Sequence, residues 1–126
     1  MSFNWVEFLG FAQSLIGDFD TRPHGEEAKF RAAVSRAYYA AHGMAREKLK
    51  HEGHTVPTKR AHQYVIDAFR NSRDKSRIRI ADDLNVLLSK RIKADYRADA
   101  IIQVATAKLA SQLAEGIIQG IETLAE

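Results

Sequence analysis

The residues with the chemistry of a functional site are arginines, tyrosines and acids in the basic part of this chain. Arg91 and Asp95 stand four residues apart, so on a continuous helix their side chains meet as an ion pair. In that position Arg91 either stabilises the helix or binds a phosphate group, with Asp95 orienting it. Arg36 and Tyr39 offer the same choice, because Arg36 is either solvated, stacked on Tyr39, or in contact with a phosphate. Both interpretations stay open at this level.

The histidines add one candidate for proton transfer. His62 stands early in an expected helix, where it is either a surface or packing residue or a proton-transfer group. His51 and His54 form an H-x-x-H pair, but zinc sites need three or four protein ligands and no cysteine is present. A glycine-rich phosphate loop is also absent from the sequence. We therefore predict no metal site and no cofactor.

Length and composition indicate one globular domain over residues 1–126. A hydrophobic content of 45% with 28% charged residues is ordinary for a soluble fold. No apolar stretch approaches the about 20 residues of a membrane span, and Met1–Ile16 is amphipathic, unlike a signal peptide. The lack of cysteine excludes disulfides and suits a reducing compartment. We expect a cytoplasmic protein without membrane association.

The net charge of +3 is unevenly distributed. Residues 29–97 hold seventeen basic and seven acidic side chains, whereas both flanking segments are acidic on balance. A basic middle of this kind is either the footprint of a polyanion such as RNA or a set of solvated helix faces that cancel in three dimensions.

Apolar residues recur at helical spacing in five segments, and no segment alternates with strand period. In the longest, Phe30–Lys50, Tyr38 belongs to the apolar stripe, while Arg36, Tyr39 and Gly43 fall on the polar side. The predicted fold class is all-α, a five-helix up-and-down bundle. We expect helices over about Phe3–Ile16, Glu26–Lys50, Thr58–Arg70, Ile78–Ala94 and Arg97–Leu124, with turns at Gly17–Gly25, His51–Pro57 and Asn71–Ser76.

The ends and faces of these helices can also be predicted. Ser2 or Asn4 is the expected cap of the first helix, Thr58 of the third and Asp95 of the last. Gly116 and Gly120 inside the last helix indicate close packing or a frayed end. The expected core stripe of that helix is Ile101, Ile102, Ala105, Leu109, Leu113, Ile117, Ile121 and Leu124.

Three segments carry a resemblance to a known family. Ser35-Arg36-Ala37-Tyr38-Tyr39-Ala40-Ala41 resembles the SRAYYAA signature of HEPN-domain proteins, most closely their small stand-alone bacterial and archaeal members. Thr58–His62 with Phe69 downstream, and Leu87-Leu88 followed by Arg91–Tyr96, are similar to two further family segments in the same order, and the final amphipathic helix completes the pattern. The first motif is fairly specific, and the other two are short. The resemblance covers about Glu26–Leu124.

The resemblance implies a HEPN-like helical bundle, often a homodimer, that works around nucleic acids. Many HEPN proteins are metal-independent endoribonucleases, and several are toxins paired with a minimal nucleotidyltransferase. Their catalytic motif is an arginine, four to six residues, then a histidine, contributed by both subunits. The RNA 2′-hydroxyl acts as nucleophile, histidine moves the proton, and arginine neutralises charge on the phosphate. The expected partners are therefore a second copy, RNA or a nucleotide, and a nucleotidyltransferase.

This chain departs from that motif after Arg91. Four residues intervene, Tyr96 then stands in place of histidine, and no histidine follows. Tyrosine, with a pKa near 10, is a poor base at neutral pH, and losing a general base costs a factor of about 10²–10⁴ in rate. On a straight helix Arg91 and Tyr96 are about 140° apart, so acting together requires the helix to end or kink near Asp95.

We therefore predict a weakly active or inactive HEPN-like protein. It would bind RNA, a nucleotide or a nucleotidyltransferase partner, in a toxin–antitoxin or defence system. One alternative is a metal-independent endoribonuclease toxin that uses Arg91 with Tyr96 or His62. The other is a purely structural helical bundle.

Overall fold

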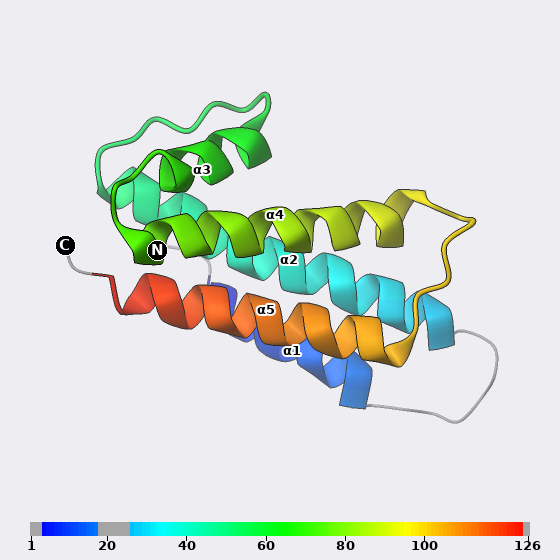
Figure 1. Ribbon diagram of the computed structural model, residues 1–126. Coiled ribbons are helices and arrows are strands. Elements are labelled where there is room, and N and C mark those ends of the chain that lie inside the picture. The colour runs from blue at the N-terminus through cyan, green and yellow to red at the C-terminus, as the bar shows by residue number, and fades with distance from the viewer. Residues whose placement is uncertain (1–3, 18–25, 125–126) are drawn as a thin grey trace.

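The computed structural model describes residues 4–17 and 26–124, and within these ranges every regular element is a helix. This confirms the predicted all-α, five-helix bundle (Figure 1). Ser2, Phe3 and most of the predicted turn at Gly17–Gly25 lie outside the described residues. The helices are α1 (Trp5–Gly17), α2 (Glu26–His51), α3 (Ala61–Arg70), α4 (Lys75–Tyr96) and α5 (Val104–Glu122).

The long helix α2 is the centre of the bundle and packs against the other four helices. In Figure 1, α1, α4 and α5 run alongside α2, while the short α3 lies over one end of α2 and α4. Because α4 and α5 are joined by a short linker, they run antiparallel. None of the described helices combines the length and apolar character that a membrane span requires.

Small residues on α2 allow the neighbouring helices to pack closely against it. Ala37 and Ala41 are fully buried, and Tyr38 between them is buried as predicted. Gly43 was expected on the polar side, but it lies beneath the indole of Trp5 from α1. A Cβ atom at Gly43 would overlap the Trp5 ring, so glycine is what allows α1 to pack there.

The cap of α1 is the predicted one, whereas α3 and α4 begin at other residues than expected. Asn4 caps α1 as predicted, its side-chain oxygen accepting from the backbone N–H groups of Val6 and Glu7. Thr58 does not cap α3, which begins only after Arg60, a residue in the left-handed region at φ 57°. The cap of α4 is Asp74, so this helix begins before the predicted Ile78.

The predicted core stripe of the last helix is confirmed in its second half, at Ile117 and Ile121, and is wrong in its first half. The helix begins at Val104, seven residues later than expected, and Ile101 and Leu109 are 78% and 45% exposed. In that first half alanines occupy the buried face, because α5 packs closely against the alanine-rich α2. A Cβ at Gly116 would meet nothing within 4 Å, so close packing does not explain that glycine. The buried residues of α5 are Ala107, Ala110, Ser111, Ala114, Ile117, Ile118 and Ile121.

Candidate functional site

Arg91 on α4 is the centre of a polar cluster between α2 and the end of α4. Its side chain is only 12% exposed. Nη2 donates to the hydroxyl oxygens of Tyr39, at 2.6 Å, and Tyr96, at 3.3 Å. Nε lies 2.9 Å from Oδ2 of Asp95, which confirms the predicted contact. That N–H is not aligned for a hydrogen bond, so the contact with Asp95 is an ion pair only.

Three tyrosine rings surround the Arg91 guanidinium. Its carbon lies 5.0 Å from the ring centre of Tyr39, 5.2 Å from that of Tyr96 and 6.0 Å from that of Tyr38. At these distances each ring face attracts the cation. Tyr38 is buried, whereas Tyr96 is 68% exposed and forms the outer side of the cluster.

The end of α4 brings Tyr96 within reach of Arg91. The helix ends at Tyr96, immediately after Asp95, as joint action of Arg91 and Tyr96 requires. Asp95 is not the cap of α5, because a linker intervenes and the cap position belongs to Gln103. Asp95 instead accepts a hydrogen bond of 3.1 Å from the Ser35 hydroxyl on α2. Its carboxylate therefore joins α2 to α4 beside the site.

Two histidines extend the cluster toward α3. His62, in the first turn of α3, has Nδ1 2.6 Å from the Tyr38 hydroxyl, and its ring centre lies 5.9 Å from that of Tyr39. The ring of His42 on α2 stacks on Tyr38 and lies 4.5 Å from His62. No role for His42 could be predicted from the sequence, because a buried histidine is recognised only by the side chains that the fold places around it.

Burial and positive charge keep both histidines neutral. Burial, with the nearby charges of Arg91 and Arg46, lowers the pKa of His62. The pKa of His42 is lowered further, to about 3. Burial is the largest cause, followed by the charges of His62, Arg46 and Arg91. Burial also raises the pKa of Tyr38, so this phenol keeps its proton.

The protons of the Tyr38 hydroxyl and the His62 ring can be assigned from the hydrogen bonds that these two side chains can form. The buried Tyr38 hydroxyl has His62 Nδ1 as its hydrogen-bond partner among the described residues, so we assign the phenol proton to that bond. Neutral His62 then carries its own proton on Nε2. In this tautomer His62 is a hydrogen-bond donor and not a base, which makes the cluster better suited to binding an anion than to removing a proton.

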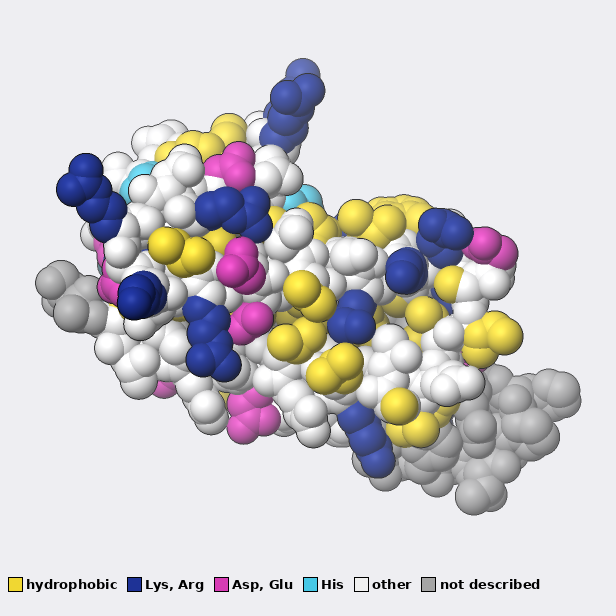
Figure 2. Space-filling view, in the orientation of Figure 1, with side chains coloured by type: hydrophobic (Ala, Val, Ile, Leu, Met, Phe, Trp, Pro, Cys, Tyr) yellow, Lys and Arg dark blue, Asp and Glu magenta, His cyan; other side chains and the backbone are white. Residues whose placement is uncertain are grey.

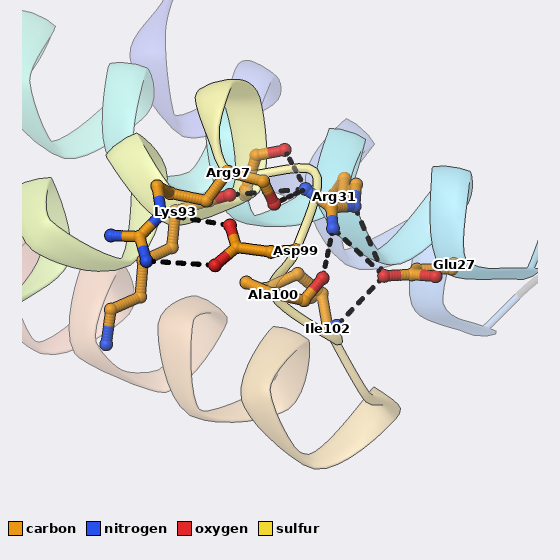
Figure 3. A network of polar contacts seen from close by, with 8 residues as sticks. Glu27, Arg31, Lys93, Arg97, Asp99, Ala100 and Ile102 are labelled. Atoms are coloured by element: carbon orange, nitrogen blue, oxygen red, sulfur yellow. Dashed lines mark hydrogen bonds and ion pairs between the residues drawn. The ribbon is translucent and has the colours of Figure 1, made fainter.

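A second polar network holds the end of α4 in place (Figure 3). Arg31 on α2 donates to the carbonyl oxygens of Lys93 and Ala94 in the last turn of α4, at 3.2 and 2.9 Å. It also donates to the carbonyls of Arg97 and Ala100 in the linker. The charge of Arg31 thus lies at the C-terminal end of α4, where the helix dipole favours a cation.

Glu27 completes this network. Its carboxylate accepts from Arg31 and from the backbone N–H of Ile102 at 3.1 Å. The Ile102 hydrogen bond, followed by that of Arg31, lowers the pKa of Glu27. This network was not predicted, although a polar stripe on α2 indicates it in the sequence. The stripe recurs every four residues, at Glu27, Arg31, Ser35 and Tyr39.

The structure gathers most, but not all, of the predicted site residues. Tyr39, Arg91, Asp95 and Tyr96 contact one another, and His62 adjoins them through the Tyr38 and Tyr39 rings. Arg36 does not belong to the cluster. Its guanidinium lies 5.7 Å from the ring centre of Phe11 on α1, because position 36 points to a different side of α2.

The cluster reaches the surface at Tyr96. A hollow of about 760 Å³ lies between the C-terminal ends of α2 and α5, where Met44, His51 and Ile121 contribute to its lining. None of the Arg91 cluster residues lines it.

Comparisons with family models, with curated proteins and with solved structures give no significant match to this chain.

Proposed function

We propose that the Arg91 cluster binds a phosphate group of RNA or of a nucleotide, in a HEPN-like bundle with weak or no ribonuclease activity. The observation that carries this proposal is the pair of hydrogen bonds from one guanidinium to the hydroxyls of Tyr39 and Tyr96. A hydroxyl oxygen that accepts from arginine keeps its own O–H for another acceptor. Arg91 therefore orients two O–H donors beside a positive charge, which suits a phosphate oxygen.

Tyr96 adds a surface for a base. Its side chain is 68% exposed at the last residue of α4, so its ring can turn without disturbing the helix. Bases stack on aromatic side chains with about 1–3 kcal/mol per base. A cation with hydroxyl donors next to an exposed ring matches the phosphate and the base of one nucleotide.

Weak catalysis follows from the proton positions. Tyr96 replaces the expected histidine, and His62 carries its proton on Nε2 when Tyr38 donates to Nδ1. Neither group is ready to deprotonate a 2′-hydroxyl at neutral pH.

The test is fluorescence anisotropy with a short labelled single-stranded RNA in EDTA. Removing a charged hydrogen-bonding group costs about 1.5–3 kcal/mol, so Arg91→Ala should weaken binding at least about tenfold. It should also lower the salt slope by about 0.7, the value for one phosphate on a single strand. Arg79→Ala is the matched control, because Arg79 is on the same helix with a side chain that is 86% exposed. Equal losses in both variants would refute a specific role for Arg91.

Metal-independent RNA cleavage is a second candidate function. It is favoured by His62, whose lowered pKa leaves it neutral near pH 7 and whose ring adjoins the Arg91 cluster. If Tyr38 rotates and releases Nδ1, His62 gains a free ring nitrogen that can act as base. Incubation with RNA in EDTA should then yield 2′,3′-cyclic phosphate ends, lost in both Arg91→Ala and His62→Gln. Equal cleavage by the wild type and both variants would exclude this function.

The family resemblance extends the proposal to a protein partner. We propose that a small nucleotidyltransferase binds this chain in a toxin–antitoxin or defence system. Co-expression with the product of the adjacent gene, followed by co-purification, tests this pairing. An adjacent gene of an unrelated class would remove its support.

A further inference from the structure

A hollow of about 380 Å³ lies where the end of α4, the first turn of α5 and the linker that joins them (residues 97–103) meet. We call it the linker hollow. Its lining includes Lys90 and Lys93 of α4, Ile101 and Ile102 of the linker, and Thr106 of α5, but no residue of the Arg91 cluster. Small-molecule sites have volumes of about 300–1,000 Å³. The linker hollow is therefore large enough for a small ligand.

This hollow carries an excess of positive charge. Arg97 and Asp99 both line it, and they pair with each other through two hydrogen bonds of 3.1 Å, so their charges offset each other. The Arg97 hydrogen bond lowers the pKa of Asp99, which therefore stays a carboxylate. Figure 3 shows the Lys93 side chain beside this pair. Within the described part of the chain, the ammonium groups of Lys93 and of the half-buried Lys90 have no hydrogen-bond or ion-pair partner. The two lysines thus leave the hollow without a counter-charge.

The linker supplies an apolar wall beside these charges. Ile101 is 78% exposed, and Ala100 and Ile102 line the hollow with it. Figure 2 shows Lys and Arg side chains among hydrophobic ones over the end of α4 and the linker. Removing the exposed Ile101 side chain from water is favourable, so a ligand with a hydrocarbon part gains affinity by covering it.

The apolar wall is fixed by contacts within the chain. Arg31 donates to the carbonyl oxygens of Arg97 and Ala100, and Glu27 accepts from the backbone N–H of Ile102. These contacts hold both ends of the linker segment that lines the hollow. A wall that is already ordered lowers the entropic cost of binding a ligand.

The start of α5 also favours an anion. Thr106 brings a hydroxyl group to the hollow from the first turn of this helix. The side chain of Gln103 does not cap α5, so it offers no acceptor to the backbone N–H groups of that turn. The positive end of the helix dipole therefore adds to the charge of the two lysines.

We propose that the linker hollow binds a small organic anion, whose oxyanion group contacts Lys90 and Lys93 and whose hydrocarbon part packs against Ile101. Ammonium and hydroxyl groups are donors suited to carboxylate or phosphate oxygens. An ion without a hydrocarbon part leaves Ile101 exposed, and an uncharged hydrocarbon leaves the lysines without a counter-charge. An alkyl carboxylate and an alkyl phosphate both carry the two parts. This site requires no contact with Arg91, so it is independent of the phosphate site proposed above.

Isothermal titration calorimetry of the full chain with octanoate tests the proposal. Acetate carries the same charge without the hydrocarbon, so octanoate should bind at least about tenfold more tightly than acetate. Octylamine carries the same hydrocarbon with the opposite charge, and it should not bind beside the lysines. Octyl phosphate distinguishes the two kinds of anion, because the tighter of octanoate and octyl phosphate shows which oxyanion group the hollow prefers.

Charge removal locates the bound anion. Lys90→Gln and Lys93→Gln should each weaken octanoate binding about threefold or more, and the double variant about tenfold or more, because each lysine contributes separately. The matched control is the double variant Lys75→Gln with Lys108→Gln, which removes two exposed lysines of the same two helices that do not line the hollow. Its affinity for octanoate should equal that of the wild type.

Ile101→Ser tests the apolar wall. Because Ile101 is mostly exposed, the substitution leaves the core intact, and octanoate binding should fall about threefold or more. A wild type that does not bind octanoate or octyl phosphate overturns the proposal. Octanoate binding that neither the lysine variants nor Ile101→Ser weaken overturns it too, and so does octylamine binding as tight as that of octanoate. Arg91 is unchanged in all these variants, so their outcome is separate from that of the RNA titration.

Discussion

The Tyr38 hydroxyl on α2 and Nδ1 of His62 on α3 lie 2.6 Å apart, and this bond connects the bundle core to the edge of the Arg91 cluster. Tyr38→Phe removes the donor and leaves the His62 nitrogen without its partner. Such a loss costs about 1–2 kcal/mol, so the urea midpoint should fall with an unchanged m-value.

A double-mutant cycle isolates this bond from packing. Tyr38→Phe and His62→Phe should show a coupling energy of about 1 kcal/mol, because neither variant can form the bond without the other partner. Independent, additive effects would show that the two side chains contribute to stability separately.

His42 should make stability depend on pH. Its pKa is lowered from 6.5 to about 3 in the fold, so the unfolded chain binds the proton more readily. Its contribution is complete above pH 6.5 and is lost as pH falls toward 3, with a limiting slope of about 1.4 kcal/mol per pH unit. Unfolding by urea between about pH 5 and 6.5 avoids most carboxylate titration.

His42→Phe provides the comparison in that experiment. Phenylalanine keeps a ring that can stack on Tyr38 but does not titrate. The stability of the variant should therefore depend less on pH, and the remaining slope in this range belongs mainly to His62 and its lowered pKa. An identical slope in the variant and the wild type would contradict the role given to His42.

The fold followed from sequence because local patterns are sufficient to specify helices. The stripe containing Tyr38 and the Asn4 cap were both predictable, since each depends on nearby residues. The late start of α5 at Val104 was not, because the linker before it is held by Arg31, far away in the sequence. A contact between residues so far apart in the sequence leaves no periodic pattern from which it could be predicted.

The candidate site was predictable to a similar extent. The four-residue spacing of Arg91 and Asp95 indicated their ion pair. The role of Tyr39 depends on how α2 and α4 are rotated against each other, and so does the exclusion of Arg36. Packing decides such rotations, and helix periodicity alone does not specify them.

Arg31 should be a principal source of stability at the end of α4. Arg31→Ala removes one charged group that donates to carbonyls of the last turn of α4 and of the linker. We expect a loss of about 2–3 kcal/mol, because charged donors contribute more than neutral ones. Amide hydrogen exchange should also accelerate locally, at Arg97 and Ile102.

Arg70→Ala is the control for charge removal. Arg70 pairs with Asp82 at 3.6 Å, with side chains 41% and 63% exposed. Pairs this exposed contribute less than about 1 kcal/mol. Comparable losses in Arg31→Ala and Arg70→Ala would mean that the carbonyl contacts of Arg31 contribute little.

Two glycines should respond oppositely to alanine. Gly43→Ala places a methyl group into the Trp5 ring, so α1 must move, at a cost of about 1–3 kcal/mol. Gly116→Ala meets no neighbouring atom and should gain about 1 kcal/mol from helix propensity. Thermal unfolding measures both, and the emission of Trp5, the single tryptophan, should change only in the first. Equal shifts in both variants would contradict the close packing at Gly43.

Tyr96 should contribute to RNA binding through both its hydroxyl and its ring, and two substitutions separate these parts. Tyr96→Phe keeps the stacking surface but loses the oxygen that accepts from Arg91 at 3.3 Å. Tyr96→Ala loses both. Stacking is worth about 1–3 kcal/mol per base, so the alanine variant should bind about fivefold or more weaker than the phenylalanine variant.

The salt dependence distinguishes stacking from charge in the same titration. Neither Tyr96 variant changes the number of positive charges, so the slope of log K against log salt should match the wild type, unlike that of Arg91→Ala. Ribose 5-phosphate, which carries a phosphate but no base, should bind both variants equally and more weakly than the wild type, because both variants lack the Tyr96 hydroxyl and the ligand offers nothing to stack on the ring. If Tyr96→Ala binds RNA as tightly as Tyr96→Phe, the exposed ring takes no part in binding.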